Sequence, residues 1–274
     1  MKTKLKILII LALLTCLLTA CTGITVQEHN IIVAGSTSVQ PYAEKLAELY
    51  MAGNAGSVID IQGGGSSAGI TAAETGTANI GMSSRLLKEK EQGLWSIEIA
   101  KDGLAIIIHP ANQIDDLTLE QIRSIYQGDI KNWNELGGDN KNIHVITREE
   151  GSGTRSAFED LVMDKNRIKP KAIVQPSNGS VRQQVSDDKY AIGFISLGLV
   201  DHQPGLKPVK AIKIDGIEAT RENVINESYS LFRPFLFVTE EKPTGKTEQF
   251  IEFVLSQEGQ TILSKEGLIP TGDN

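Results

Sequence analysis

Short apolar runs alternate with amphipathic stretches along most of the chain. Residues 31–34 form a β-branched run that predicts a strand, and the amphipathic segment 41–50 predicts a helix. The same order recurs in residues 58–61 and 68–74, and another short strand is expected at 78–81. This alternation of strands and helices predicts an α/β protein.

Two longer apolar segments, residues 103–109 and 229–238, divide the chain. They bracket a middle block that has its own predicted strands and helices. We therefore predict two lobes hinged by two crossover strands, with residues 31–105 plus 231–274 forming lobe 1 and residues 106–230 forming lobe 2. Helices expected at residues 247–255 and 257–265 would complete lobe 1.

The N-terminus has the pattern of an export signal. Residues 1–20 begin with three lysines, continue as an apolar run over residues 7–18, and end at Ala20 before Cys21. This order is typical of a secretory signal peptide, and the run is shorter than the ~20 residues of a membrane-spanning helix. The sequence Leu18-Thr19-Ala20-Cys21 resembles the bacterial lipobox, in which the cysteine is acylated and becomes the new N-terminus.

Cysteine content agrees with a lipid anchor. Cys16 would be removed with the signal, so Cys21 would be the only cysteine left and no intramolecular disulfide could form. The alternative is a cysteine that merely follows a signal peptide. With acylation, residues 21–30 would be a lipidated tether, and the protein would be anchored to the extracytoplasmic face of the cell membrane.

Length and charge narrow the class of protein further. Removal of residues 1–20 would leave 254 of the 274 residues, enough for one large or two medium domains, and would change the formal net charge from −7 to −10. This acidic balance argues against a nucleic-acid partner.

Three loops rich in glycine and hydroxyl groups each follow a predicted strand and open a predicted helix. They comprise residues 35–41, 63–69 and 150–155. Free backbone N–H groups at helix N-termini attract anions, glycine allows close approach, and Ser and Thr add hydroxyl donors. Each loop could instead be an ordinary helix cap. Together the three loops favour a cage of neutral donors for an anion.

Arg148 and Glu150 bear on the identity of that anion. In an extended chain, residues two apart point to the same side. Arg148 could hold oxyanion oxygens, whereas Glu150 would repel an anion unless the anion carried a proton to donate, as hydrogen phosphate does and sulfate does not. The alternative makes Glu149 and Glu150 acidic first-turn residues with Arg148 as their surface partner. The residues alone leave both interpretations open.

An enzyme active site and a metal site are the alternatives to a binding site. Residues 65–69 fit the G-x-S-x-G pattern with Ser67 as nucleophile, but no histidine lies in a recognisable partner motif. The four histidines are scattered, and no H-E-x-x-H motif or cysteine pair is present. We expect no catalysis, no cofactor and no metal.

The loops also carry a family resemblance that runs from about residue 31 to residue 270. The chain resembles the phosphate-binding proteins of Pst-type ABC transporters, which have a periplasmic-binding-protein-like fold of type II. The matching segments come in the family's order: residues 35–41, 63–69, 80–85, 121–128, 132–138 and 148–154.

The resemblance implies a ligand site for inorganic phosphate. By position, its donors would be Thr37, Ser38, Ser66, Ser152, Gly153 and Thr154, with Arg148 as the cation and Glu150 as the proton acceptor. Some family members have an aspartate where this chain has Ser84, which is followed by Arg85. Glu150 would then be the remaining acceptor, and Arg85 a second cation or a lobe-closure contact.

The resemblance also implies partners and a role. The chain would be an extracytoplasmic lipoprotein that closes on phosphate and delivers it to a Pst-type permease and ATPase complex for import. The alternatives are a binding protein for another oxyanion, such as sulfate or molybdate, or a non-transport surface adhesin or sensor of the same fold.

Overall fold

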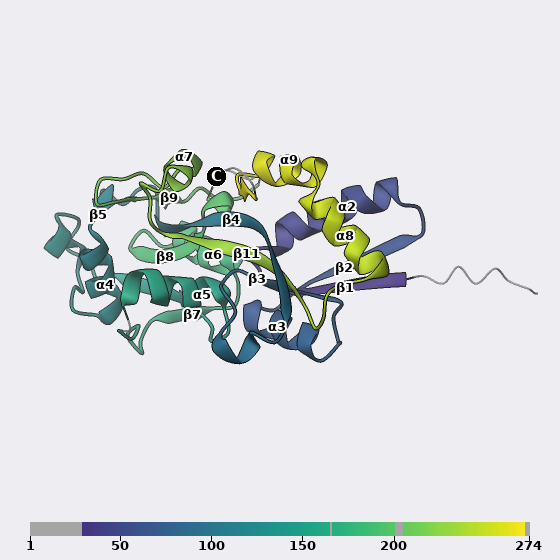
Figure 1. The fold of residues 1–274 in the computed structure, drawn as a ribbon. Coiled ribbons are helices and arrows are strands. Elements are labelled where there is room, and N and C mark those ends of the chain that lie inside the picture. Colours follow the sequence, from purple (N-terminus) through teal and green to yellow (C-terminus); the bar gives the residue numbers. More distant parts are fainter. Residues whose placement is uncertain (1–28, 165, 201–204, 272–274) are drawn as a thin grey trace, which may run out of the picture.

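Two lobes that share long strands make up the fold. The computed structural model describes residues 29–164, 166–200 and 205–271. The first lobe contains β1 (His29–Gly35), α2 (Gln40–Gly53), β2 (Ser57–Gly63), α3 (Ser66–Glu74), β3 (Ile80–Ser83), β11 (Phe232–Thr239), α8 (Gly245–Leu255), α9 (Gln257–Lys265) and β12 (Ile269–Pro270). In Figure 1 the purple and yellow ends of the described chain lie together in this lobe.

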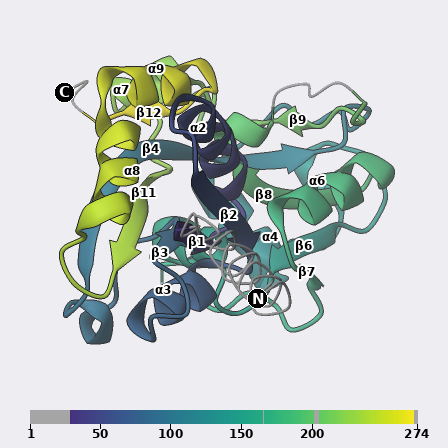
Figure 2. The ribbon, with the colours of Figure 1, turned by 90° about the vertical axis from the view of Figure 1, so that its right-hand side faces the viewer.

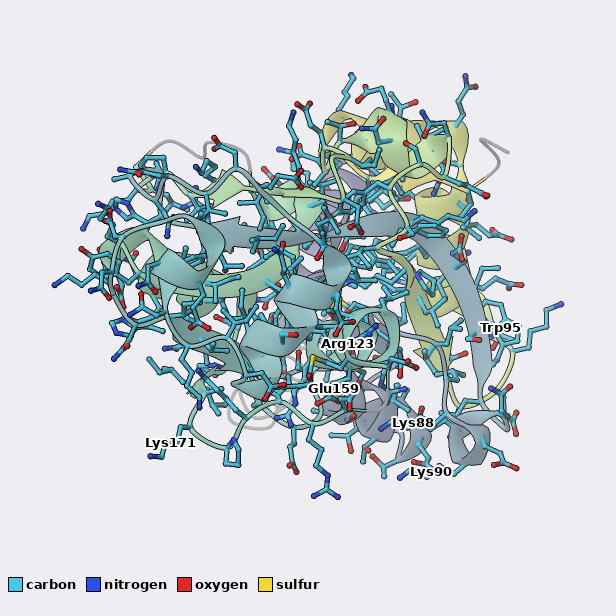
Figure 3. All side chains as sticks on the ribbon, turned by 90° about the vertical axis from the view of Figure 1, so that its left-hand side faces the viewer. Lys88, Lys90, Trp95, Arg123, Glu159 and Lys171 are labelled. Carbon is cyan, nitrogen blue, oxygen red and sulfur yellow. The ribbon has the colours of Figure 1, made fainter. Side chains whose placement is uncertain are left out.

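The second lobe is formed by the middle of the sequence. It contains β5 (Asp116–Leu117), α4 (Leu119–Gln127), β6 (His144–Arg148), α5 (Gly153–Phe158), β7 (Ile173–Gln175), α6 (Asn178–Asp187), β8 (Ala191–Ser196), β9 (Lys210–Ala211), β10 (Lys213–Ile214) and α7 (Arg221–Ile225). A π-helical turn, Glu159–Met163, continues α5. Trp95 of the first lobe and Lys171 of the second lie at opposite ends of the face in Figure 3.

Strand β4 (Trp95–Ile108) runs through both lobes. Its first part, to Gly103, pairs antiparallel with β11, and its second part, from Leu104, pairs antiparallel with β8. The strands therefore follow one path, β2-β1-β3-β11-β4-β8-β6-β7. The chain crosses between lobes along β4 and again just before β11, as the two long apolar segments predicted.

The core of the first lobe packs α2, α8 and α9 against the sheet. Leu46, Val33, Phe237, Phe250 and Leu263 are completely buried in it. The C-terminal helices thus cover strands formed by the N-terminal part of the chain, and Figure 2 shows yellow α8 and α9 beside purple α2. Helices at residues 247–255 and 257–265 were predicted for this lobe, and the structure has them as α8 and α9.

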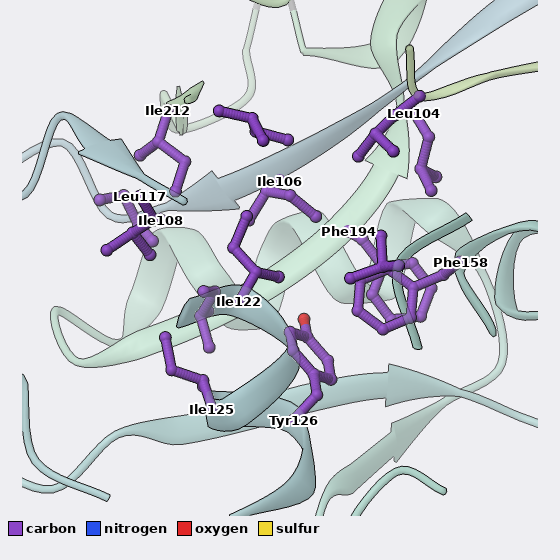
Figure 4. Close-up of a cluster of buried hydrophobic side chains, with 14 of the residues drawn as sticks. Leu104, Ile106, Ile108, Leu117, Ile122, Ile125, Tyr126, Phe158, Phe194 and Ile212 are labelled. Carbon is purple, nitrogen blue, oxygen red and sulfur yellow. The ribbon is translucent and has the colours of Figure 1, made fainter. Parts of the chain in front are cut away.

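The core of the second lobe is built around aromatic rings. Phe158 of α5 stacks on Phe194 of β8 with 4.1 Å between ring centroids, and Tyr126 of α4 lies 4.4 Å from Phe158 (Figure 4). Such pairs add to the hydrophobic stabilisation, which is about 2 kcal/mol for each large apolar side chain that becomes buried. This packing fixes α5 at the carboxyl ends of β6 and β8.

The α/β class and the two crossover strands agree with the sequence prediction, whereas the lobe boundaries at residues 105 and 231 stay predictions. Within the described residues, no helix has the length and apolar character needed to cross a membrane. The predicted signal peptide, Cys21 and most of the tether lie outside the described residues.

Candidate anion-binding site

The N-termini of α2, α3, α5 and α6 converge where the two lobes meet. Ser38 Oγ of the loop before α2 lies 2.8 Å from Thr154 Oγ1 in the first turn of α5. Asn178, the first residue of α6, donates from Nδ2 to Ser38 Oγ at 2.9 Å. All three side chains are at most 1% exposed, so the lobes lie close together around them. We call this group of buried polar side chains the cage.

The first lobe contributes a chain of serine hydroxyls to the cage. Ser36 Oγ donates to Ser84 Oγ at 2.9 Å, and Ser84 Oγ lies 3.3 Å from Ser66 Oγ. The backbone N–H of Ser84 also donates to Ser66 Oγ at 3.0 Å. The loop after β3 and the first residue of α3 are therefore locked together.

Close backbone packing explains how α3 reaches this position. A Cβ atom added at Gly69 would lie 2.4 Å from the carbonyl oxygen of Ala34, and one at Gly81 would lie 2.4 Å from the carbonyl oxygen of Gly69. Only glycine lets the helix backbone lie directly on β1 and β3. The glycines of the predicted loops thus bring Ser66 beside Ser84.

The second lobe reaches this serine chain through Gly153. A Cβ atom at Gly153 would lie 2.1 Å from Ser66 Oγ and 2.6 Å from Ser84 Oγ. Ser152 caps α5, because its hydroxyl accepts a hydrogen bond from the N–H of Arg155 at 3.2 Å. The first N–H groups of a helix have no carbonyl partner within it, and this start of α5 carries the cage residue Thr154.

Arg148, at the end of β6, supplies a guanidinium group to the cage. The side chain is 1% exposed. Its Nη2 donates to Thr37 Oγ1 at 3.3 Å, and its Nη1 lies 3.5 Å from Thr154 Oγ1. Glu149 pairs with Arg148 through two hydrogen bonds, Nε–Oε2 at 2.9 Å and Nη2–Oε1 at 2.8 Å. The positive charge of Arg148 is therefore largely balanced by the carboxylate of Glu149.

Glu150 does not lie with Arg148, contrary to the alternation argument. Strand β6 ends at Arg148 and the chain turns at Glu150 and Gly151, whose φ is +91°. The two-residue period holds only in extended chain, so the turn directs Glu150 outward. Glu150 is exposed and lines a separate cavity of about 660 Å³ with Arg155, Glu159 and Asp160 among others. Its predicted role as proton acceptor therefore has no support from this geometry.

Arg85 is also engaged elsewhere. Its Nη1 and Nη2 bind Glu91 at 2.7 and 3.0 Å, and Nη2 donates to Ser67 Oγ at 3.2 Å. Burial raises the pKa of Glu91, but the hydrogen bonds from Arg85 and the N–H of Lys88 outweigh burial, and the net pKa is lowered. Arg85 thus pairs with an acid of its own lobe, and its side-chain hydrogen bonds go to Glu91, Ser67 and the carbonyl oxygen of Leu86, which are not cage residues.

Three residues of the cage and its surroundings lie outside every loop that the sequence analysis identified: Asn178, Arg233 and Asp102. Arg233 Nη2 donates to Ser38 Oγ at 3.0 Å and to Asp102 Oδ2 at 3.0 Å. Arg233 and Asp102 are 3% and 1% exposed. Burial raises the pKa of Asp102. The positive charge of Arg233 favours the ionised form of Asp102 and offsets only part of this increase.

A sequence signal existed for Asn178 but not for the other two. Residues 176–180, Pro-Ser-Asn-Gly-Ser, follow β7 and open α6, in the same way as the three predicted loops follow a strand and open a helix. Asp102 lies in β4 and Arg233 in β11, the two strands that cross between the lobes. Apart from being charged residues in apolar strands, they belong to no sequence motif.

The remaining candidate chemistry has other partners. Among the described residues, no group of three or more His, Cys, Asp or Glu side chains is arranged to hold a metal ion. Ser67 Oγ accepts a hydrogen bond from Arg85. His144 Nδ1 lies 2.6 Å from Asp188 Oδ2, and His109 Nδ1 accepts from the N–H of Ala111 at 3.0 Å. His109 and His144 therefore make hydrogen bonds to groups other than Ser67.

Comparisons with known proteins give the family. The PBP superfamily domain matches residues 22–258. The phosphate-binding protein PstS of Borreliella burgdorferi is 31% identical over 276 residues, which cover 97% of this chain and 98% of that protein. PstS of Bacillus subtilis is 28% identical, covering 89% of this chain and 81% of that protein.

Solved structures agree in fold. A Clostridium perfringens structure described as a phosphate ABC transporter substrate-binding protein, solved with bound phosphate, is 44% identical with a TM-score of 0.84 and covers 89% of this chain and 100% of that one. An ABC-type phosphate transport receptor of Vibrio cholerae is 38% identical with a TM-score of 0.72, covering 87% and 99%. The chain therefore has the two-lobe periplasmic-binding-protein-like fold and belongs to the PBP superfamily, in its family of PstS-type phosphate-binding proteins.

Proposed function

We propose that this chain binds inorganic phosphate in the cage between its lobes and delivers it to an ABC importer. The observation that carries the proposal is the convergence of buried hydroxyl groups, helix N-termini and Arg148 at one point. Such donors bind a small oxyanion and offer little to an apolar ligand. The names of the relatives support phosphate as that anion.

The test is calorimetric titration of the soluble chain from Thr22 onward with phosphate, sulfate and molybdate. We expect tight phosphate binding and binding of the other two anions that is at least about tenfold weaker, since they are the strongest competitors for helix-end donors. If sulfate or molybdate bound more tightly than phosphate, that anion and not phosphate would be the ligand. Absence of binding by all three would refute the cage as an anion site.

The specificity mechanism can be tested with two neighbouring variants. Glu150→Gln changes the predicted acceptor, which is exposed, and Glu149→Gln changes the carboxylate that binds Arg148. We expect Glu150→Gln to leave the ratio of phosphate to sulfate affinity unchanged and Glu149→Gln to change it. The opposite result would restore Glu150 as the acceptor.

We further propose that the mature protein is a lipoprotein on the extracytoplasmic face of the membrane. The order of lysines, apolar run and Cys21 supports this. Its transport partners would be a Pst-type permease and ATPase complex. Cell fractionation with radiolabelled palmitate tests the anchor: the wild type should be labelled in the membrane fraction, and Cys21→Ala should be unlabelled. Equal labelling of both would refute acylation at Cys21.

A further inference from the structure

The hydrogen bonds around Ser38 and Thr37 in the cage each have a defined direction. A serine or threonine hydroxyl has one proton to donate and two lone pairs that accept. Arginine and the amide nitrogen of asparagine can only donate. A hydroxyl that already accepts two bonds from such groups must use its own proton to donate.

Ser38 meets this condition. Its Oγ accepts from Arg233 Nη2 at 3.0 Å and from Asn178 Nδ2 at 2.9 Å. Thr37 meets it as well, because its Oγ1 accepts from Arg148 Nη2 at 3.3 Å and from Asn178 Nδ2 at 3.2 Å. Both hydroxyls can therefore only donate. The Ser38 hydroxyl donates to Thr154 Oγ1, which lies 2.8 Å away, or to a ligand in its place, and the Thr37 hydroxyl is available to donate to a ligand.

The orientations of these donors are themselves fixed. The backbone N–H of Ser196 donates to Asn178 Oδ1 at 3.3 Å, which turns the Asn178 amide nitrogen toward the hydroxyls. Asp102 Oδ2 accepts from Arg233 Nε at 3.1 Å and from Nη2 at 3.0 Å. The other oxygen of Asp102 accepts from Ser196 Oγ at 2.7 Å. Asp102, Arg233, Ser196 and Asn178 thus form one buried network behind Ser38.

The serine chain on the other side of the cage differs. Ser84 Oγ accepts from Ser36, and its bond with Ser66 can run in either direction. Ser84 can therefore still accept a proton from a ligand. On one side of the cage, Ser38 and Thr37 can only donate hydrogen bonds. On the other side, Ser84 can either donate or accept.

We propose that Arg233, Asp102 and Asn178 are positioning residues that hold Ser38 and Thr37 as donors, so that the cage selects an oxyanion whose oxygens on that side carry no proton. The proposal rests on the proposed function and specifies its ligand as the doubly ionised form of phosphate. The single proton of that form would face Ser84.

The test measures protons released when phosphate binds. At about pH 6 a phosphate group is a mixture of singly and doubly ionised forms. Selection of the doubly ionised form then releases protons, which calorimetry in two buffers of different ionisation enthalpy counts. Wild type should release protons. The double variant Arg233→Gln/Asp102→Asn, which leaves no buried charge unpaired, should release fewer and bind phosphate about tenfold more weakly.

Two further variants separate this role from a structural one. Asn178→Leu removes the amide that donates to Ser38 and Thr37 and keeps the Arg233–Asp102 pair. We expect it to reduce proton release as well. If the double variant does not fold, Asn178→Leu takes its place in the test. Gln260→Leu is the control, because Gln260 is a buried amide that binds the carbonyl oxygens of Ile99 and Val254 outside the cage. We expect it to lose stability but to keep the proton release of the wild type.

The outcomes are distinguishable. A wild type that binds no phosphate would refute the proposed function itself. A wild type that binds phosphate without releasing protons, or cage variants that release as many protons as the wild type, would overturn the positioning role alone.

Discussion

At the scale of single residues, the cations around the cage are each balanced by an acid. Arg148 binds Glu149, and Arg233 binds Asp102. Buried charges are costly unless they are paired, so this pairing lets two arginines lie beside the ligand position. The hydroxyl and N–H groups then provide most of the direct contacts to an anion.

Arg148→Lys should weaken phosphate binding about 10- to 100-fold. Lysine keeps the charge, but it cannot bind Glu149 through two bonds and reach Thr37 and Thr154 at the same time. Titration calorimetry measures the change. Arg123→Lys is the matched control, because Arg123 binds Glu120 and the carbonyl oxygen of Val162 outside the cage (Figure 3). Equal loss in both variants would argue against a specific role for Arg148.

Gly153→Ala should reduce phosphate affinity by at least about tenfold and leave the fold intact. The new methyl group would meet Ser66 Oγ and Ser84 Oγ at distances too short for contact, so the two lobes could not close around the ligand. Gly93→Ala is the control, since a Cβ there meets nothing within 4 Å. Calorimetry and circular dichroism would check both effects, and undiminished binding would contradict the close approach.

At the scale of elements, helix starts bring the donors together. The N-termini of α2, α3, α5 and α6 meet because each helix follows a strand of the same extended sheet path. Carboxyl ends of neighbouring parallel strands lie at one edge, as for β1 with β3 and β6 with β8. The strand-to-helix loops of both lobes therefore open toward a common cleft.

Glu91→Gln tests how the segment after β3 is held in place. The pKa of Glu91 is lowered in the folded protein, so its ionised form stabilises the fold above the ordinary range of a glutamate, and this stabilisation is lost as pH falls through the lowered pKa. We expect the variant to be about 2 kcal/mol less stable at neutral pH, and the difference to shrink in acid.

Urea unfolding at neutral and acidic pH measures this difference. Glu89→Gln is the control, because it changes an exposed acid in the short 3-10 helix Glu89–Glu91 that also contains Glu91. A deficit for Glu91→Gln that is the same at both pH values would show that the Arg85–Glu91 pair is not its source.

At the scale of the whole molecule, the cage is assembled from residues of both lobes. Ser38 and Ser66 come from the first lobe, Thr154 and Asn178 from the second, and Arg233 from the crossing strand β11. A ligand that binds this arrangement must stabilise it over unfolded states and over any state in which the lobes lie apart.

Phosphate should therefore raise the midpoint of thermal unfolding in a concentration-dependent way. Phosphate at about a hundred times its Kd should add about 2.7 kcal/mol to the free energy of unfolding. Differential scanning calorimetry checks this, with sulfate as the matched anion. An equal shift with sulfate would indicate a general salt effect instead of binding in the cage.

The sequence by itself determined the alternation of strands and helices at the start of the first lobe, the two C-terminal helices, the crossing segments and three of the four donor loops. These features depend on neighbours within a few residues: the period of apolar positions, and glycine and hydroxyl groups beside helix starts. Arg148 could be identified for the same reason, since it ends a strand directly before such a loop.

Only the tertiary structure decided which of these groups meet. The turn after β6 directs Glu150, the predicted proton acceptor, outward, and it is Glu149 that pairs with the buried Arg148. The network behind Ser38 joins residues 38, 102, 178, 196 and 233, which are far apart in sequence. Their meeting depends on sheet register and on how the lobes close, and both are set by packing over the whole chain, which no local pattern records.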